Sequence, residues 1–180
     1  MRIIAGQYKG RRLEAVTAQG IRPTSDRVRE AVFSIIADRI PGARVLDIFA
    51  GTGALGLEAL SRGASHTTFI DVSPQSCELI KKNADRCGIH DKACIICHDM
   101  SRGILPEHIK GKPFSIIFMD PPYGTSLLET ALNSGILNQI LARDGIIIAE
   151  HSIKAALSHT ITGLDIHDQR KYGKTRISFL

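Results

Sequence analysis

A glycine-rich turn between an apolar run and a helix-forming stretch limits the fold of this chain more than any other feature. It lies within VLDIFAGTGALGLEALSRG, residues 45–63, where Gly51 and Gly53 separate the apolar run from the helix formers. Glycine reaches backbone conformations that other residues avoid, and it lets a ligand approach the main chain closely. The amides at the start of the following helix are free to bind that ligand. The stretch therefore predicts a buried strand over 45–49, a helix over 54–62 and a ligand-binding turn between them.

The same turn matches the spacing of a dinucleotide-binding fingerprint. Gly51, Gly53 and Gly56 have the required separations, and Asp71 lies twenty residues after Gly51. Asp47, in the expected strand, favours a different ligand, because a carboxylate repels a pyrophosphate and attracts positive charge. S-adenosylmethionine carries an ammonium and a sulfonium group and no phosphate, so its charge has the favourable sign. Asp47 also has a purely structural alternative role, which is to cap the turn.

Beyond this unit, apolar runs and helix-like stretches alternate along the chain. We expect further strands over residues 67–71, 93–97, 114–119 and 145–150, and helices over residues 74–87, 101–109 and 127–141. Residues 164–170 and 175–180 are expected to form two strands joined at Tyr172-Gly173. The alternation predicts an α/β protein with a mostly parallel sheet, helices on both faces and an antiparallel edge made by the terminal hairpin.

The first forty residues are expected to form an extension ahead of the sheet. Residues 1–15 have the pattern of a β-hairpin, and Thr24 or Ser25 is placed to cap a helix that runs to about residue 40. The expected apolar face of that helix holds Val28, Val32, Ile35 and Ile36. We therefore divide the chain into residues 1–40, a hairpin-and-helix extension, and residues 41–180, one compact unit.

Positive charge collects at the two ends of the chain. The formal net charge is +5; residues 1–30 hold seven Lys or Arg against three Asp or Glu, and residues 168–180 hold four against one. If the fold brings these ends together, they would form a basic rim suited to phosphate backbones. The alternative is that they are solvated surfaces that keep the protein in solution.

The cysteines raise the question of a metal site. Cys94 and Cys97 have the spacing of a zinc knuckle. Both fall in an expected strand, where residues three apart point to opposite faces, so one ion cannot take both thiolates. We expect no metal. The chain also shows no signal-peptide pattern and no apolar run long enough to cross a bilayer, so we expect a cytoplasmic protein without membrane contact.

An aspartate stands at the end of each of the first four expected strands; these are Asp47, Asp71, Asp99 and Asp120. Ligands of parallel α/β sheets bind beyond the carboxyl ends of the strands, so these acids are expected to face one crevice. Asp71 is placed to accept hydrogen bonds from ribose hydroxyls. Asp99 could accept one from an adenine amino group, while the backbone amide of Met100 meets the ring.

Asp120-Pro121-Pro122-Tyr123 is the most specific stretch in the chain. Two prolines directly after a buried strand stop it and fix the directions of the neighbouring carbonyls. The exocyclic amine of a nucleobase is a poor nucleophile because its lone pair is delocalised into the ring. The Asp120 carboxylate and the Pro121 carbonyl could accept its hydrogens, and Tyr123 could stack on the base. The stretch therefore predicts transfer of a methyl group to a base amine, achieved mainly by positioning.

These motifs resemble those of the S-adenosylmethionine-dependent amino-methyltransferases, whose signature is an acidic or amide residue followed by Pro-Pro and an aromatic residue. More narrowly, the chain resembles the bacterial 16S ribosomal RNA guanine-N2 methyltransferase family of the RsmD type. The matching segments span nearly the whole chain: residues 1–6, 22–30, 47–64 and 120–123, and Tyr172-Gly173 with Thr175. The resemblance implies a Rossmann-like methyltransferase fold with a seven-stranded sheet. It also implies transfer of one methyl group to N2 of a guanine in small-subunit rRNA, on a flipped-out base.

The resemblance further implies roles by position. The residues expected at the target base are Asp120, Pro121, Pro122 and Tyr123. Those expected at the cofactor are Asp47, Ala50, Gly51, Thr52, Gly53, Asp71, Val72, Asp99 and Met100. Those expected at the RNA are Lys9, Arg11, Arg12, Arg22, Thr24, Arg27, Arg29, Arg170, Lys171 and Lys174. The implied partner is ribosomal RNA, free or in an assembling small-subunit particle, and the protein is expected to be a monomer.

Other functions stay open at this point. The four-residue signature alone does not choose the base, so an amino-methyltransferase acting on adenine or cytosine in RNA or DNA is an alternative. A nucleotide-dependent oxidoreductase would use the same glycine turn, but Asp47 and the Pro-Pro signature disfavour it. An RNA-binding module without catalysis is disfavoured because the signature is intact.

Overall fold

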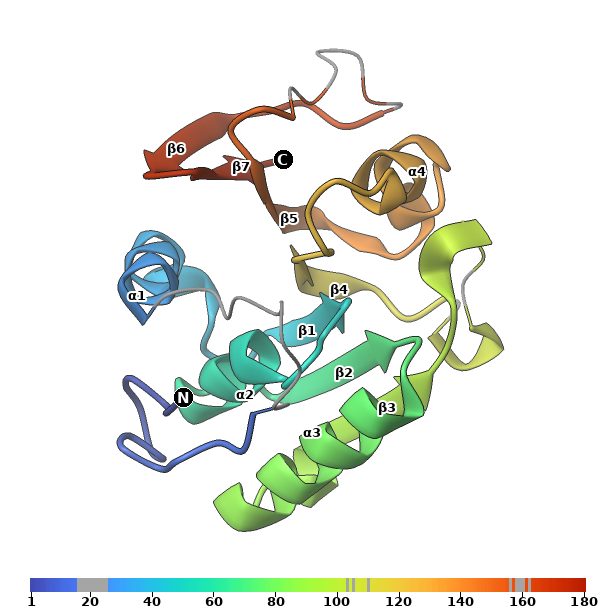
Figure 1. The fold of residues 1–180 in the computed structure, drawn as a ribbon. Helices are drawn as coiled ribbons and strands as arrows, with labels where there is room; N and C mark the ends of the chain where they lie inside the picture. The colour runs from blue at the N-terminus through green and yellow to red at the C-terminus, as the bar shows by residue number, and fades with distance from the viewer. Residues whose placement is uncertain are drawn as a thin grey trace.

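A seven-stranded sheet forms the centre of the molecule (Figure 1). The computed structural model describes residues 1–15, 26–102, 104, 106–109, 111–155, 157, 161 and 163–180. The strand order is β3-β2-β1-β4-β5-β7-β6. The strands are β1 Arg44–Ile48, β2 His66–Asp71, β3 Ala93–Cys97, β4 Phe114–Met119, β5 Leu141–Ser152, β6 Asp168–Tyr172 and β7 Thr175–Phe179. The first five are parallel, and β7 pairs antiparallel with β5 and β6, which confirms the predicted mostly parallel sheet with its terminal hairpin.

Helices cover both faces of this sheet. They are α1 Asp26–Ile35, α2 Ala54–Ser61, α3 Pro74–Cys87 and α4 Leu127–Asn133, with short 3-10 segments η1 Ala37–Arg39, η2 His90–Lys92, η3 Met100–Arg102, η4 Glu107–Ile109 and η5 Leu137–Gln139. One core cluster joins α1, α2 and α3 to the sheet, and a second joins α4 to the opposite face (Figure 1). Ile116 and Phe118 of β4 lie in the first cluster and Ile117 and Met119 in the second. An uninterrupted apolar strand is thus covered on both sides, as its composition predicts.

Three predicted helices are shorter than expected. The helix predicted to reach residue 141 ends at Asn133, because Gly135 adopts a left-handed conformation with φ of 68°. Among the described residues of the stretch predicted as a helix over 101–109 there are two short 3-10 segments, η3 and η4, and Pro106, which has no amide hydrogen to donate, lies between them. The N-terminal helix ends at Ile35 instead of running to about residue 40.

Two strands also have different limits from those expected. β5 starts at Leu141, which pairs with Phe114, and the register shifts before Ile146 pairs with Ile116. With this irregularity β5 includes residues 141–144 ahead of the strand predicted over 145–150, and it ends two residues later, at Ser152. β6 begins only at Asp168, four residues later than expected.

The N-terminal hairpin is fastened to α2 by a buried carboxylate. Its arms meet at one antiparallel bridge between Arg2 and Arg12. The fully buried Glu58 accepts hydrogen bonds from the amides of Ile4 at 2.7 Å and Ala5 at 3.0 Å, and it pairs with Arg62. The apolar hairpin residues join the same core cluster as α1 and the sheet. The extension therefore shares its core with the rest of the chain.

Candidate active site

The aspartates at the carboxyl ends of three neighbouring strands lie close enough together for their charges to interact. Asp47 lies in β1, Asp71 ends β2 and Asp120 follows β4, and β1 lies between β2 and β4 where the strand order reverses. Ligands of α/β sheets bind at this switch point. Burial raises the pKa of Asp47 well above its usual range, and the charges of Asp120 and Asp71 raise the same pKa further. The structure thus brings together three of the four predicted acids.

The fourth acid, Asp99, lies farther along the same edge, beyond β3. Its carboxylate is exposed and accepts a hydrogen bond from the Ser101 amide at 2.8 Å, which lowers the pKa of Asp99. The Met100 side chain beside it is buried at 2% exposure. Asp99 therefore lies on the same edge of the sheet as Asp47, two strands away.

The glycine turn between β1 and α2 is held by two of these carboxylates. Asp47 accepts a hydrogen bond from the Gly56 amide at 2.9 Å, and Asp71 accepts one from the Gly51 amide at 2.8 Å. Phe49 and Gly51 have positive φ angles of 64° and 55°. A positive φ is unusual for a bulky residue and is found mainly where the surrounding structure enforces it. Asp47 therefore does brace the turn, the structural role that the sequence left open.

Space and charge around this turn suit a cationic nucleoside-like ligand. A Cβ atom added at Gly51 would find its nearest neighbour 4.0 Å away, so the turn has open space on that side. Val72, directly after β2, exposes 62% of its surface, which offers an apolar contact beside the half-buried Asp71. Ala50, Thr52 and Gly53 complete the turn, with the Gly53 amide bonded to the Ala50 carbonyl at 2.7 Å. The residues present fit the predicted S-adenosylmethionine.

The Asp-Pro-Pro-Tyr stretch leaves the carboxyl end of β4 beside Asp47. Pro121 is buried, and Thr125 donates a hydrogen bond to the Pro122 carbonyl at 2.8 Å, which closes the turn. Tyr123 is 46% exposed, whereas its hydroxyl donates to Glu150 at 2.8 Å and is bonded to Thr175 at 2.7 Å. Burial and the Glu150 charge raise the pKa of Tyr123, so the phenol stays protonated.

Glu150 and Thr175 were not among the predicted site residues. Glu150 lies at the carboxyl end of the apolar part of β5, the same type of position that identified the four aspartates. That rule could therefore have found it. Thr175 is next to the Tyr-Gly turn, but nothing in the local sequence indicates that it contacts Tyr123, 52 residues away.

Most of the predicted RNA-facing cations lie on the surface. Lys9, Arg11, Arg12 and Arg27, with Arg170, Lys171 and Lys174, are exposed, and Arg22 and Thr24 lie outside the described residues. Arg11 also donates to the Arg86 carbonyl at 2.6 Å, and Arg170 pairs with Asp168 at 2.7 Å. The two basic ends flank α1, which lies between the N-terminal hairpin and β6–β7 (Figure 1).

The prediction that Arg29 faces RNA is wrong. Its side chain is fully buried, donates to the Arg2 carbonyl and pairs with Asp26 at 3.1 Å. The apolar face of α1 contains Phe33, which is fully buried, in place of the predicted Ile35, which is 47% exposed. Arg29 lies one helical turn before Phe33, so the true face carries it inward. Burial lowers the pKa of Arg29, and the nearby Glu58 charge opposes that effect.

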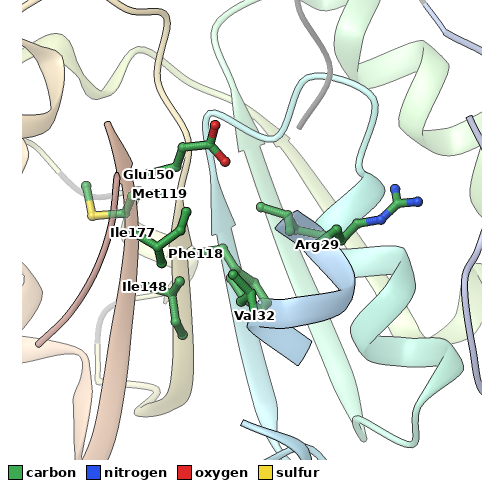
Figure 2. A pocket seen from close by; sticks show the side chains of 8 residues that line it. Arg29, Val32, Phe118, Met119, Ile148, Glu150 and Ile177 are labelled. Atoms are coloured by element: carbon green, nitrogen blue, oxygen red, sulfur yellow. The ribbon is translucent and has the colours of Figure 1, made fainter. Parts of the chain in front are cut away.

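A small apolar pocket lies between α1 and the sheet. It is lined by Arg29, Val32, Leu55, Phe118, Met119, Ile148, Glu150 and Ile177. In Figure 2 the Arg29 guanidinium extends away from the sheet strands, while the Glu150 carboxylate points out above the apolar side chains. The two charged groups therefore diverge, and Glu150 is oriented toward the strand ends.

Two cysteine thiols hydrogen-bond to backbone carbonyls at the end of β2. Cys77 and Cys97 donate to the consecutive carbonyls of Asp71 and Val72, at 3.7 and 3.6 Å. Among the described residues, no group of three or more His, Cys, Asp or Glu side chains is arranged to hold a metal ion. Within the same ranges, no helix has the length and apolar character required to span a bilayer.

Comparisons with known proteins agree with this geometry. The model of the family described as "Conserved hypothetical protein 95" matches residues 1–180. "Putative rRNA methyltransferase YlbH" of Bacillus subtilis is 36% identical over 99% of this chain and 97% of its own length. "Ribosomal RNA small subunit methyltransferase D" of Escherichia coli K12 is 37% identical over 97% of this chain and 86% of its own length. The solved structure of Escherichia coli yhhF has a TM-score of 0.83 and 35% identity, covering 99% of this chain and 96% of that one. The predicted Rossmann-like methyltransferase fold is confirmed.

Proposed function

The chain belongs to the Conserved hypothetical protein 95 family, and from this premise we propose that it is an S-adenosylmethionine-dependent rRNA methyltransferase. Its substrate is small-subunit ribosomal RNA, and the methyl group is transferred to the exocyclic N2 of a guanine. Relatives that are 37% and 34% identical, from Escherichia coli and Haemophilus influenzae, are named ribosomal RNA small subunit methyltransferase D, which supports this substrate class. One geometric observation carries the proposal: Asp120 to Tyr123 leave β4 beside Asp47 and the glycine turn.

The target amine is held by the turn after β4. The Asp120 carboxylate and the Pro121 carbonyl accept the two amine hydrogens, which favours a pyramidal and more nucleophilic nitrogen. The exposed Tyr123 ring stacks on the base, a contact worth about 1–3 kcal/mol. Because stacking requires an accessible ring face, the guanine must be flipped out of its helix to reach this position.

The cofactor is held by the turn after β1 and by the end of β2. When bound, S-adenosylmethionine supplies an electrophilic methyl group on a sulfonium. Asp47 and Asp71 provide the negative charge that attracts it, and the second lone pairs of the Asp71 oxygens are available to ribose hydroxyls. Val72 packs on the adenine, and Asp99 with the Met100 amide recognises its polar edge. The remaining contact residues are Ala50, Gly51, Thr52 and Gly53.

The RNA is bound on the two sides of α1. Lys9, Arg11 and Arg12 extend from the N-terminal hairpin, Arg27 from α1, and the cations of the β6–β7 hairpin from the other side. We assign residues 1–40 to an RNA-facing extension of the methyltransferase unit 41–180. We propose that the protein acts as a monomer on an assembling small-subunit particle.

Methyl transfer with a radiolabelled donor tests this function. The substrates are unmodified 16S rRNA transcripts, small subunits reconstituted from such transcripts, and double-stranded DNA. After nuclease digestion, we expect label in N2-methylguanosine from one or both rRNA substrates and none from DNA. Label in N6-methyladenosine, in a methylated cytosine or in DNA would overturn the assignment of the base or of the nucleic acid.

A further inference from the structure

The hydroxyl of Tyr123 is held by two side chains from the antiparallel edge of the sheet. Glu150 accepts a hydrogen bond from it at 2.8 Å, and the Thr175 hydroxyl lies 2.7 Å from the same oxygen. Glu150 lies on β5 and Thr175 is the first residue of β7. The Pro-Pro-Tyr turn after β4 is therefore tied to two strands that follow it in the sheet.

The carboxylate that receives this bond is held in place by the structure around it. Glu150 exposes only 8% of its surface and pairs with Ile177 of β7 in the sheet register. Below it lie Met119, Ile148 and Ile177, and its carboxylate points out above them toward the strand ends (Figure 2). A buried strand residue of this kind has few alternative rotamers, so it is a rigid anchor for the phenol.

The position of Thr175 is fixed by backbone pairing with two neighbouring strands. It pairs with Ser152 of β5 on one side and with Tyr172 of β6 on the other. Lys174 directly precedes it, and Arg170 and Lys171 lie on the adjoining strand. The residue that contacts the Tyr123 hydroxyl thus belongs to the same hairpin as the exposed cations.

We propose that Glu150 and Thr175 are positioning residues that fix the Tyr123 ring for stacking on the target base. This inference rests on the proposed function of Tyr123. Tyr123 is 46% exposed, so its side chain has several accessible orientations unless its hydroxyl is held. Stacking on a base requires the ring in one fixed orientation. The contacts of the Tyr123 hydroxyl with Glu150 and Thr175 fix the ring in this way. The β6–β7 hairpin then serves both RNA binding and the shape of the base site.

A double-mutant cycle tests the proposal. The single variants are Tyr123→Phe, Thr175→Val and Glu150→Gln, and each double variant combines Tyr123→Phe with one of the others. Tyr123→Phe and Thr175→Val should each lower kcat about three- to tenfold, the usual range for one lost hydrogen bond, with a smaller effect on KM. Glu150→Gln should have a smaller effect in the same direction, because it replaces a charged acceptor for the hydroxyl with a neutral one. In the Tyr123→Phe background, Thr175→Val and Glu150→Gln should have a smaller effect than in the wild-type background, because the hydroxyl through which they position the ring is missing. Additive losses would overturn the proposal.

A second measurement needs no methyl transfer. The chain has three tyrosines, so fluorotyrosine labelling should yield three fluorine NMR signals, and Tyr123→Phe identifies the one from Tyr123. Thr175→Val and Glu150→Gln should shift or broaden that signal, while Thr130→Val, a change of the same type on α4, should leave it unchanged. An unchanged Tyr123 signal in both test variants would contradict the proposal even if the enzyme is active. A wild-type protein that methylates no rRNA but shows the expected shifts would instead contradict the proposed function alone.

Discussion

The buried Asp47 carboxylate accepts a hydrogen bond from the Gly56 amide at 2.9 Å, across the glycine turn that joins β1 to α2. The same carboxylate is close enough to Asp71 and Asp120 for their charges to raise its pKa. One side chain therefore braces the cofactor turn and adds to a cluster of negative charge. Burying Asp47 close to two other carboxylates lowers the stability of the fold, because a buried anion among anions is unfavourable. The same cluster of negative charge favours binding of a cationic ligand.

Asp47→Asn separates these two effects. The amide oxygen still accepts from Gly56, but the negative charge of deprotonated Asp47 is lost, so affinity for S-adenosylmethionine should fall about 10- to 100-fold at a pH above the raised pKa of Asp47. The raised pKa means that the folded chain retains a proton that the unfolded chain has released. The stabilising contribution of Asp47 is therefore largest at acid pH and declines as pH rises through the folded pKa. The melting temperature of the variant relative to wild type should increase as the pH rises above about 4, the pKa of an unfolded Asp. A constant difference over this range would show that Asp47 is not buried as an unfavourable anion.

Asp120→Ala tests the assignment of the amine acceptor. The change removes one of two acceptors for the guanine amine and leaves the glycine turn and Asp71 in place. Methyl transfer should fall by at least about 100-fold. Affinity for S-adenosylmethionine, measured by calorimetry, should stay within a few-fold of wild type. Loss of cofactor binding would place Asp120 in the cofactor site instead.

Arg27 and Arg29 are neighbours on α1 with opposite exposure, so they form a matched pair. Arg27→Ala should weaken RNA binding and reduce the slope of log affinity against log salt by about 0.7–0.9, the value for one phosphate contact, with no change in melting temperature. Arg29→Ala should instead lower the free energy of unfolding by about 3 kcal/mol, because it removes a fully buried charge from Glu58 and Asp26. An unchanged salt slope for Arg27→Ala would remove this residue from the RNA interface.

Gly6 and Gly10 test the attachment of the N-terminal hairpin. Both have a φ of 83°, but a Cβ at Gly6 would lie 1.9 Å from the Ser61 carbonyl oxygen, whereas a Cβ at Gly10 meets nothing within 4 Å. Gly10→Ala should cost only the backbone strain, about 1 kcal/mol. Gly6→Ala should cost more and should speed hydrogen exchange at the Ile4 and Ala5 amides that Glu58 binds. Equal costs in urea unfolding would mean that the hairpin does not pack on α2 as described.

The turn between β1 and α2 and the Pro-Pro stop after β4 could be predicted because both follow from neighbouring residues. Local periodicity also predicted β4, whose apolar run is buried on both faces. Local periodicity does not identify the buried face of α1, because Ile35 fits the helical spacing as well as Phe33 does. Only packing against Phe118, 5.5 Å between ring centroids, selects Phe33. That rotation of the helix is what buries Arg29.

The sequence by itself determined the order of strands and helices, the glycine turn with its acids, and the Asp-Pro-Pro-Tyr stretch. Each of these depends on side chains within a few positions of one another. The tertiary structure alone decided that Arg29 is internal, that Glu58 binds the hairpin and that Glu150 and Thr175 hold Tyr123. Those contacts join residues between 27 and 54 positions apart. They exist only because the sheet places its strand ends side by side, which no local pattern encodes.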